Sequence, residues 1–453
     1  MADTLKPDTL FQESLKLCGD PAEAESQWEG LRPCLSAEAS KTDGLRFLFA
    51  LLGNSRFLVH RLLQAPDPTA AIDALVLSPH LLKPKEDVEM LEELRAELRA
   101  GRRTEQARVA RLLRDFKYRE ITRIAARDLA GLAPFEEIGA ELADLAAACT
   151  EAAVEAAGEI ARAGESGGFR EAFLVLAMGK FGGRDLNFSS DIDLLYVHGR
   201  PVAAEAGSRS VFEHFCRVSE MVTRLLHDRT EDGFVFRVDL DLRPEGKSGV
   251  IVNSVDALAS YYEISGADWE RAALIKARPV AGDAGLGRET LALIEPFVFP
   301  KYTDASAIDG LKRMKEKINA DLKKSKAGGF HVKLGTGGIR EIEFFVTAFQ
   351  LLFGGKEPRL RERHTLTALR LLGRLGLVPE EDVSRLEEAY VFLRRIENRL
   401  QMQEERQTHR LPTDAPALAA MARRMGFAAT GDFEAALKMK TDFVASCFER
   451  LAS

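Results

Sequence analysis

The change of hydrophobic period along the chain is the feature that most constrains its fold. Over residues 45–145, and again from residue 339 onward, apolar residues recur every three or four positions, which is typical of amphipathic helices. The intervening region instead contains short apolar or alternating runs, typical of strands: Phe173–Met178, Asp191–His198 and Phe234–Leu242. The sequence therefore predicts an α+β, predominantly helical fold, in which a small mixed sheet lies between N- and C-terminal helical regions.

These changes of period also predict the domain organisation. A chain of 453 residues is long enough for roughly three packing units at about 150 residues each. We expect an N-terminal helical region over residues 1–125, a catalytic core over residues 126–334 and a C-terminal helical region over residues 335–453.

Charge and cysteine usage exclude several classes of protein. The net charge is −7, so we expect no nucleic-acid partner that depends on a general positive field. Five scattered cysteines without a CxxC pair argue against a disulfide framework and against a thiolate zinc site. We find neither an export signal nor an apolar run long enough to span a membrane, so we expect a cytoplasmic protein with no membrane association.

The most informative segment contains two closely spaced aspartates. Because side chains alternate along a strand, Asp191 and Asp193 are predicted to project from one face, about 6.6 Å apart. Paired carboxylates on a rigid face suit a hard divalent cation and hence phosphoryl or nucleotidyl transfer. A solvated strand face is the alternative, and a DxD pattern by itself does not exclude it.

The neighbouring residues favour the metal site. Gly182 and Gly183 permit a tight turn whose amides can approach a phosphate, and Ser189 and Ser190 supply further donors just before the acids. Asp239, on the run 234–242, is predicted to complete the site from a neighbouring strand. A glycine turn, a DxD strand and an acid on a later strand occur in the order seen in the nucleotidyltransferase superfamily, which this segment resembles.

Three basic residues are candidates for phosphate binding. Lys276 and Arg278 are predicted to continue a helix that contains Arg271, with a solvated helix face as the alternative. Arg340 follows the glycines of residues 335–338, where free amides at a helix entry would bind an anion. An ordinary glycine-rich helix entry is the alternative there.

Several longer motifs resemble one family within that superfamily. Over residues 120–415 the chain is similar to the glutamine synthetase adenylyltransferase family. The motifs that carry this resemblance are RIAARDLAGLAPFEEI (Arg123–Ile138), MGKFGGRDLNFSSDIDL (Met178–Leu194), FRVDLDLRP (Phe236–Pro244), DWERAALIKARPVAGD (Asp268–Asp283), GTGGIREIEFFVTAFQLLFGG (Gly335–Gly355), FLRRIEN (Phe392–Asn398) and RQTHRLP (Arg406–Pro412).

The resemblance implies a specific activity. Family members carry two nucleotidyltransferase domains, and this chain resembles the N-terminal, adenylyl-removing half, which implies a fragment of a longer protein. The implied reaction is phosphorolysis of adenylyl-tyrosine on glutamine synthetase, with orthophosphate consumed and ADP released. The implied cofactor is Mg²⁺, with Mn²⁺ as the alternative, bound by Asp191, Asp193 and Asp239. The resemblance also implies a PII-type signal protein as a partner.

Two other functions remain open from the sequence. One is nucleotidyl transfer from ATP to a protein tyrosine, and the other is a non-catalytic module that binds a PII-type protein. The chain also departs from the family at two positions. Asp241 stands where the family usually has Arg, and Asn398 stands where it more often has His. A negative charge at residue 241 is expected either to turn to solvent or to weaken phosphate binding.

Overall fold

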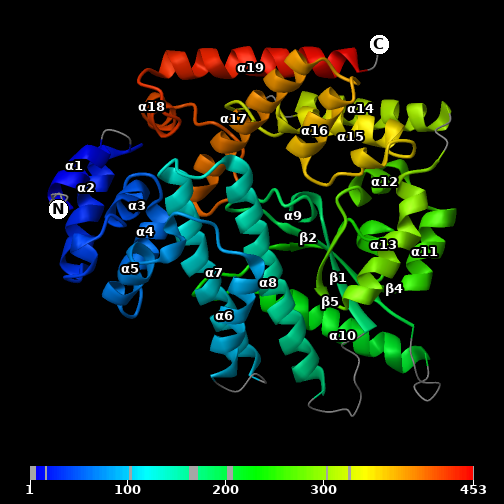
Figure 1. Ribbon diagram of the computed structural model, residues 1–453, viewed down its shortest axis with the longest axis horizontal. Coiled ribbons are helices and arrows are strands. Elements are labelled where there is room, and N and C mark those ends of the chain that lie inside the picture. The colour runs from blue at the N-terminus through cyan, green and yellow to red at the C-terminus, as the bar shows by residue number, and fades with distance from the viewer. Residues whose placement is uncertain are drawn as a thin grey trace.

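A computed structural model gives the fold of residues 7–15, 18–100, 105–162, 172–200, 208–301, 305–324 and 328–451. Helices predominate in these residues, and a small mixed sheet lies between helical regions (Figure 1). This arrangement confirms the predicted fold class. None of the described helices combines the length and the apolar character that crossing a membrane requires.

The N-terminal region is built from helices. Its described helices are α1 (Pro7–Ser14), α2 (Pro21–Leu31), α3 (Leu45–Leu51), α4 (Arg56–Leu63), α5 (Pro68–Val76), α6 (Asp87–Arg99), α7 (Gln106–Leu129) and α8 (Phe135–Arg162). Local sequence fixes several starts: at α2 the side chain of Asp20 accepts the Glu23 N–H at 3.0 Å, and Pro21 occupies the first turn. The predicted boundary between residues 125 and 126 falls inside α7.

The central region contains the sheet and the helices that cover it. Its described elements are β1 (Phe173–Met178), α9 (Gly179–Gly182), β2 (Ile192–His198), α10 (Ser208–His227), β3 (Val238–Asp239), β4 (Val252–Ser254), α11 (Val255–Ile264), α12 (Asp268–Leu274), β5 (Arg278–Gly282), α13 (Ala284–Val298) and α14 (Ala305–Lys324). The strand order is β3-β2-β1-β5, and β4 also pairs with β2. β1 is antiparallel to both of its neighbours, whereas β2 is parallel to β3 and to β4.

The two faces of the sheet contribute to different hydrophobic cores. Val175, Ala177 and Leu194 pack into the core that α7, α8 and α10 share, whereas Met178 and Leu195 pack into a second core with α11 and α13. Side chains at alternate positions of each strand thus point to opposite cores. The sheet therefore separates two hydrophobic cores. Along each strand, alternate residues point their side chains into one core or the other.

The third region is again helical. Its described helices are α15 (Ile339–Phe353), α16 (Thr365–Arg374), α17 (Glu380–Glu404), α18 (Ala415–Arg424) and α19 (Thr430–Arg450). α17 runs from α19 toward the N-terminal helices and packs against α4 (Figure 1). At this junction Ser55 Oγ donates to the Met402 carbonyl at 2.6 Å, and Arg399 forms a 2.6 Å ion pair with Asp128. α17 therefore links both ends of the chain to the central region.

Two local predictions were wrong. The run 234–242 is not one strand, because the amides of Val235 and Phe236 both donate to Leu226 O and the chain turns after Asp239. The helix expected to continue through residues 276 and 278 ends at Leu274. Residue 276 lies in the connection that follows, and residue 278 begins β5.

Candidate functional site

Two of the predicted acids face each other on neighbouring strands. β2 and β3 run parallel, and Asp193 is in register with Asp239. The pKa of the Asp193 carboxyl is raised to about 6, chiefly by burial and next by the negative charge of Asp239, with a further contribution from Asp191. Asp193 is therefore a partly buried acid whose ionised form lacks sufficient positive charge around it.

Asp191 is held differently, although it lies near the other two acids. Its Oδ1 accepts from Arg237 Nε at 2.6 Å, and its Oδ2 accepts from Gln407 Nε2 at 2.8 Å. With Asp191 in these bonds, no group of three or more His, Cys, Asp or Glu side chains within the described ranges is arranged to hold a metal ion. The structure thus places Asp193 and Asp239 together and directs Asp191 toward a guanidinium.

The glycine turn approaches this site through Gly179. Its φ is +53°, and a Cβ built there would lie 2.3 Å from Asp193 Oδ2. Only glycine fits this close approach without displacing the carboxylate. Gly182 is packed against backbone instead, since a Cβ there would lie 1.9 Å from the Lys276 carbonyl oxygen, and Gly183 faces away from the acids toward Arg363 O.

Both predicted serines lie in the loop before β2, where Ser189 bonds to the end of α17 and Ser190 bonds within the loop. Ser189 donates from its hydroxyl to Glu405 O at 3.1 Å and from its amide to Gln401 Oε1 at 2.9 Å. Ser190 Oγ accepts the Asn187 N–H at 3.0 Å. These bonds fix the course of the loop that delivers Asp191 and Asp193 to the sheet.

A buried ionic network, which sequence reasoning missed, clamps the same loop to α17. Lys180 Nζ lies 3.0 Å from Glu397 Oε2 and donates to Asn187 Oδ1 at 2.7 Å. Glu397 also lies 3.2 Å from Arg394 Nε and 2.7 Å from His409 Nδ1. Burial lowers the pKa of Lys180 to about 8, although the charge of Glu397 opposes that shift.

The signal for this network was present in the sequence. The segment FLRRIEN (Phe392–Asn398) supplies Arg394 and Glu397, and RQTHRLP (Arg406–Pro412) supplies His409. When two charged residues lie three positions apart in a helix, the sequence pattern alone predicts that they face the solvent. Here both side chains are buried, because α17 passes behind the glycine turn.

The glycine-rich entry to α15 does not present the free amides that the sequence suggested. The N–H of Ile339 donates to Val332 O at 2.9 Å, and the N–H of Arg340 donates to Lys333 O at 3.1 Å. Gly337 has φ +73° and packs against the Thr441 carbonyl. The residue that acts on the acids from this loop is Lys333, whose positive charge opposes the raised pKa of Asp193.

Lys276 and Arg278 do not join the carboxylates. Arg278 is in register with Ala177, whereas Asp193 is in register with Met178. Consecutive residues of β1 point to opposite faces, so Arg278 lies on the α8 face of the sheet and Asp193 lies on the other. Lys276 donates to Thr365 Oγ1 at 3.0 Å, next to α16.

The two family departures lie in different surroundings. Asp241 is exposed, lies 3.4 Å from Lys247 Nζ and donates its backbone N–H to Asp239 Oδ1 at 2.7 Å. Its side chain therefore turns to solvent. Asn398 is buried and accepts from Asn187 Nδ2 at 2.6 Å, while its own Nδ2 has no hydrogen-bond partner among the described residues.

Comparison with known proteins finds two matching family models and a group of relatives that share one name. Residues 45–293 match the family "Glutamate-ammonia ligase adenylyltransferase", and residues 312–452 match "GlnD PII-uridylyltransferase". A protein of Nitrosococcus oceani named bifunctional glutamine synthetase adenylyltransferase/adenylyl-removing enzyme is 42% identical over 75% of this chain and 36% of its own length. A protein of the same name from Xanthobacter autotrophicus is 37% identical over 100% of this chain and 47% of its own length. The chain thus spans a third to a half of the length of these relatives.

Proposed function

Because the chain belongs to the glutamate-ammonia ligase adenylyltransferase family, we propose that it removes AMP from an adenylylated tyrosine of glutamine synthetase by metal-dependent phosphorolysis. The observation that carries this proposal is the in-register pair of Asp193 and Asp239, with Asp191 beside it. The name of the relatives includes both an adenylyltransferase and an adenylyl-removing enzyme, and we assign the second activity to this chain.

The donor set fits a hard divalent cation. Carboxylate oxygens are the ligands that Mg²⁺ and Mn²⁺ prefer. Burial and neighbouring negative charge raise the pKa of Asp193, and a bound cation would relieve both effects. Asp193 and Asp239 would hold the ion, and Asp191 would join them by exchanging its bond with Arg237. When bound, the ion would neutralise phosphate oxygens.

The proposed reaction exchanges one phosphorus–oxygen bond for another. An oxygen of orthophosphate bonds to the α-phosphorus of adenylyl-tyrosine, and the bond from that phosphorus to the tyrosine oxygen breaks. The products are ADP and free tyrosine, whose oxygen receives the proton that hydrogen phosphate gives up. A phenolate of pKa ~10 is a good leaving group, so no dedicated general acid is needed.

The chain's own residues would orient the reactants and balance their charge. The positive charges of Lys333 and Lys180 act to lower the pKa of Asp193. Both lysines therefore offset negative charge at this site. Lys180 is fixed by Glu397 and Asn187, and therefore acts as a positioned charge. Gly179 lets the backbone of the turn pack closely against Asp193 without displacing its carboxylate.

We propose adenylylated glutamine synthetase as the substrate and a PII-type signal protein as a regulatory partner. The substrate follows from the name of the relatives. The PII-type partner is supported by the similarity of residues 312–452 to a PII-uridylyltransferase, which covers α15 to α19.

The test uses adenylylated glutamine synthetase, phosphate and Mg²⁺. The chain is expected to release ADP in a phosphate-dependent reaction, and Asp193→Asn is expected to lose at least about a hundredfold of that rate. The matched control is Asp442→Asn, which removes an exposed aspartate of α19. Phosphate-dependent release by Asp193→Asn at the unmodified rate would contradict the proposal. Transfer of label from ATP to protein would instead support the alternative of nucleotidyl transfer.

A further inference from the structure

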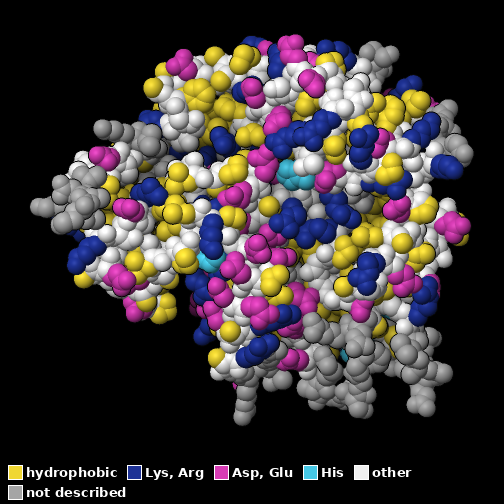
Figure 2. Space-filling model, in the orientation of Figure 1, with side chains coloured by type: hydrophobic (Ala, Val, Ile, Leu, Met, Phe, Trp, Pro, Cys, Tyr) yellow, Lys and Arg dark blue, Asp and Glu magenta, His cyan; other side chains and the backbone are white. Residues whose placement is uncertain are grey.

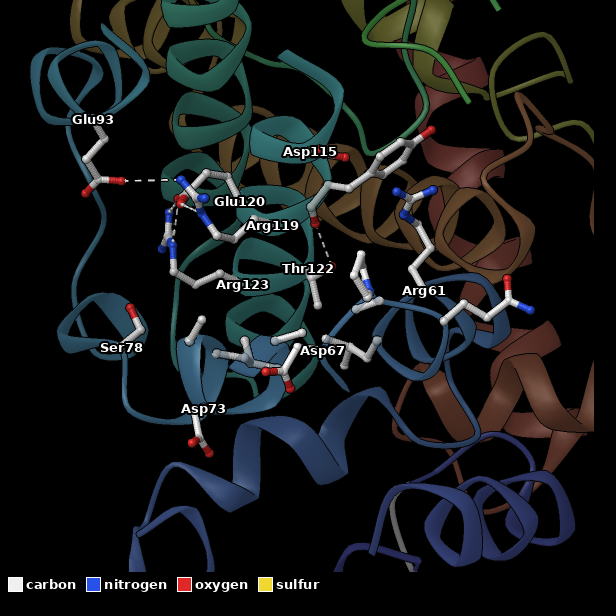
Figure 3. A pocket seen from close by; sticks show the side chains of 18 of the residues that line it. Arg61, Asp67, Asp73, Ser78, Glu93, Asp115, Arg119, Glu120, Thr122 and Arg123 are labelled. Atoms are coloured by element: carbon white, nitrogen blue, oxygen red, sulfur yellow. Dashed lines mark hydrogen bonds and ion pairs between the residues drawn. The ribbon is translucent and has the colours of Figure 1, made fainter. Parts of the chain in front are cut away.

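Two cavities outside the carboxylate site differ in how their charges are satisfied. The first, of about 1190 Å³, lies among α4, α5 and α7 (Figure 3). Arg119 contacts Glu93 at 3.8 Å, and Arg123 contacts Glu120 at 2.9 Å. Arg61 donates to the Asp232 carbonyl at 3.1 Å, and further acids, among them Asp67, Asp115 and Glu231, line the same cavity. Such a cavity has little uncompensated charge with which to select a ligand.

The second cavity, of about 520 Å³, has the opposite character. It lies between the start of α8, the glycine turn after α9, the start of β5 and the first turns of α16. Four arginines outnumber two carboxylates in its lining, which consists of Arg184, Arg278, Arg363, Arg370 and His364 with Glu136 and Glu362. Lys and Arg side chains gather on the face seen in Figure 2, over the area between α9 and α16 in Figure 1.

Two of these guanidinium groups are held by backbone carbonyls rather than by acids. Arg278 donates to Phe181 O at 3.1 Å and to Gly182 O at 3.2 Å. Arg363 donates from Nε to Ala277 O at 2.7 Å. Neither of them forms a salt bridge with a described carboxylate, whereas Arg184 and Arg370 do. Carbonyl oxygens orient a guanidinium without neutralising it, so this wall of the cavity keeps net positive charge.

The electrostatics of the group agree with this geometry. Burial lowers the pKa of Arg278 to about 10, and the charges of Arg184 and Arg363 lower it further, although Asp144 opposes the shift. Burial also lowers the pKa of Arg363 and of His364. Partly buried cations that repel one another are the setting in which an added anion is most stabilising.

From this arrangement we infer that the cavity between α8, α9 and α16 is a second anion site, separate from the carboxylates, which binds a phosphate-bearing small molecule through Arg278 and Arg363. Planar guanidinium forks match phosphate oxygens. The cavity volume lies within the roughly 300–1,000 Å³ of small-molecule sites. Pro134 and Ala140 supply an apolar wall for an organic part.

The site is independent of the proposed reaction, because β1 and the sheet face separate it from Asp193. Binding is therefore measured in EDTA, where a metal-dependent site cannot hold a nucleotide. The probes are inorganic phosphate and ADP, titrated separately into the whole chain by calorimetry. Tighter binding of ADP than of phosphate would identify an organic phosphate as the ligand, and equal binding would identify the free anion.

Arg363→Gln is expected to weaken binding of the probes at least fivefold. Arg374→Gln, an exposed arginine at the end of the same α16, and Asp193→Asn are each expected to change it less than twofold. Thr367→Glu provides a second variant in case Arg363→Gln fails to fold. It adds a carboxylate to the cavity at the third residue of α16, where negative charge favours the helix.

Saturable binding that Arg363→Gln and Thr367→Glu both weaken supports the site. The inference is overturned if neither probe binds saturably in EDTA, if Thr367→Glu folds and binds as the unmodified chain does, or if Asp193→Asn abolishes binding. The last result would place the anion at the carboxylates.

Discussion

Asp193 and Arg278 lie on opposite faces of the sheet, although the β1 residues with which they pair, Met178 and Ala177, are consecutive. The sequence suggested that these two residues shared one phosphate site. Their separation leaves Lys180 and Lys333 as the cations that act on Asp193, and it leaves the arginines around residue 278 to form a cavity of their own.

The contact between Gly179 and Asp193 gives the first prediction. Gly179→Ala is expected to lower the rate of phosphate-dependent ADP release by about tenfold or more, because the new Cβ would meet Asp193 Oδ2 at 2.3 Å and displace the carboxylate. Its positive φ adds strain of about 1–2 kcal/mol. Gly376→Ala is the control: φ is +69° there but nothing lies within 4 Å, so it should show the strain and keep the activity. Equal rates for the two variants would contradict the role of close approach.

The second prediction concerns the buried acid of α17. Glu397→Gln is expected to reduce the free energy of unfolding by about 3–5 kcal/mol, because Lys180 and Arg394 lose the negative charge that compensates them. Glu388→Gln, on the same helix but exposed and paired with Lys440, should change it by no more than about 0.5 kcal/mol. Urea unfolding measures both. A loss in Glu397→Gln no larger than in Glu388→Gln would show that the network does not stabilise the fold.

The third prediction is a pH dependence from Glu341 on α15. Burial raises the pKa of this carboxyl from 4.5 to about 7 in the folded chain. The folded state therefore binds more protons than the unfolded state between these values, so its contribution is full below about pH 4.5 and falls as pH rises to about 7. At 1.36 kcal/mol per pKa unit the loss is at most about 3 kcal/mol.

Glu341→Gln keeps the neutral form at every pH. It should match the unmodified chain near pH 4.5 and exceed its free energy of unfolding above pH 7, as chemical unfolding at a series of pH values would show. A constant difference between the two proteins across that range would contradict the raised pKa.

The fourth prediction addresses the departure at residue 241. The Asp241 side chain is exposed and lies near Lys247, so Asp241→Arg is expected to change the KM for phosphate less than about threefold. Steady-state kinetics at several phosphate concentrations measures this. A large fall in KM would show that the charge at residue 241 reaches the bound anion after all.

Several elements could be predicted from the sequence, because the residues that specify them are neighbours in the chain. The period of 3.6 identified the helical regions, and the run FLVLAM identified β1 to the residue. The spacing of Asp191 and Asp193 predicted a strand that contains both acids, and β2 begins at Ile192, so that it contains Asp193 and directly follows Asp191. The nine-residue strand expected at residues 234–242 did not form because Leu226, at the end of the preceding helix α10, accepts from the amides of Val235 and Phe236. The network of Lys180 and Glu397 likewise joins residues 217 positions apart.

The sequence by itself thus fixed the period of each segment and the identity of its acids, whereas the face on which Arg278 lies was decided by tertiary structure. β1 and β5 pair with a one-residue irregularity between Val175 and Leu176, so that Ala177 meets Arg278. If this irregularity were absent, the register that pairs Leu174 with Gly282 would continue along the strands. Arg278 would then lie opposite Met178, on the same face as Asp193. A slip of one residue moves a side chain to the other face of a sheet, and no local pattern encodes where a bulge falls.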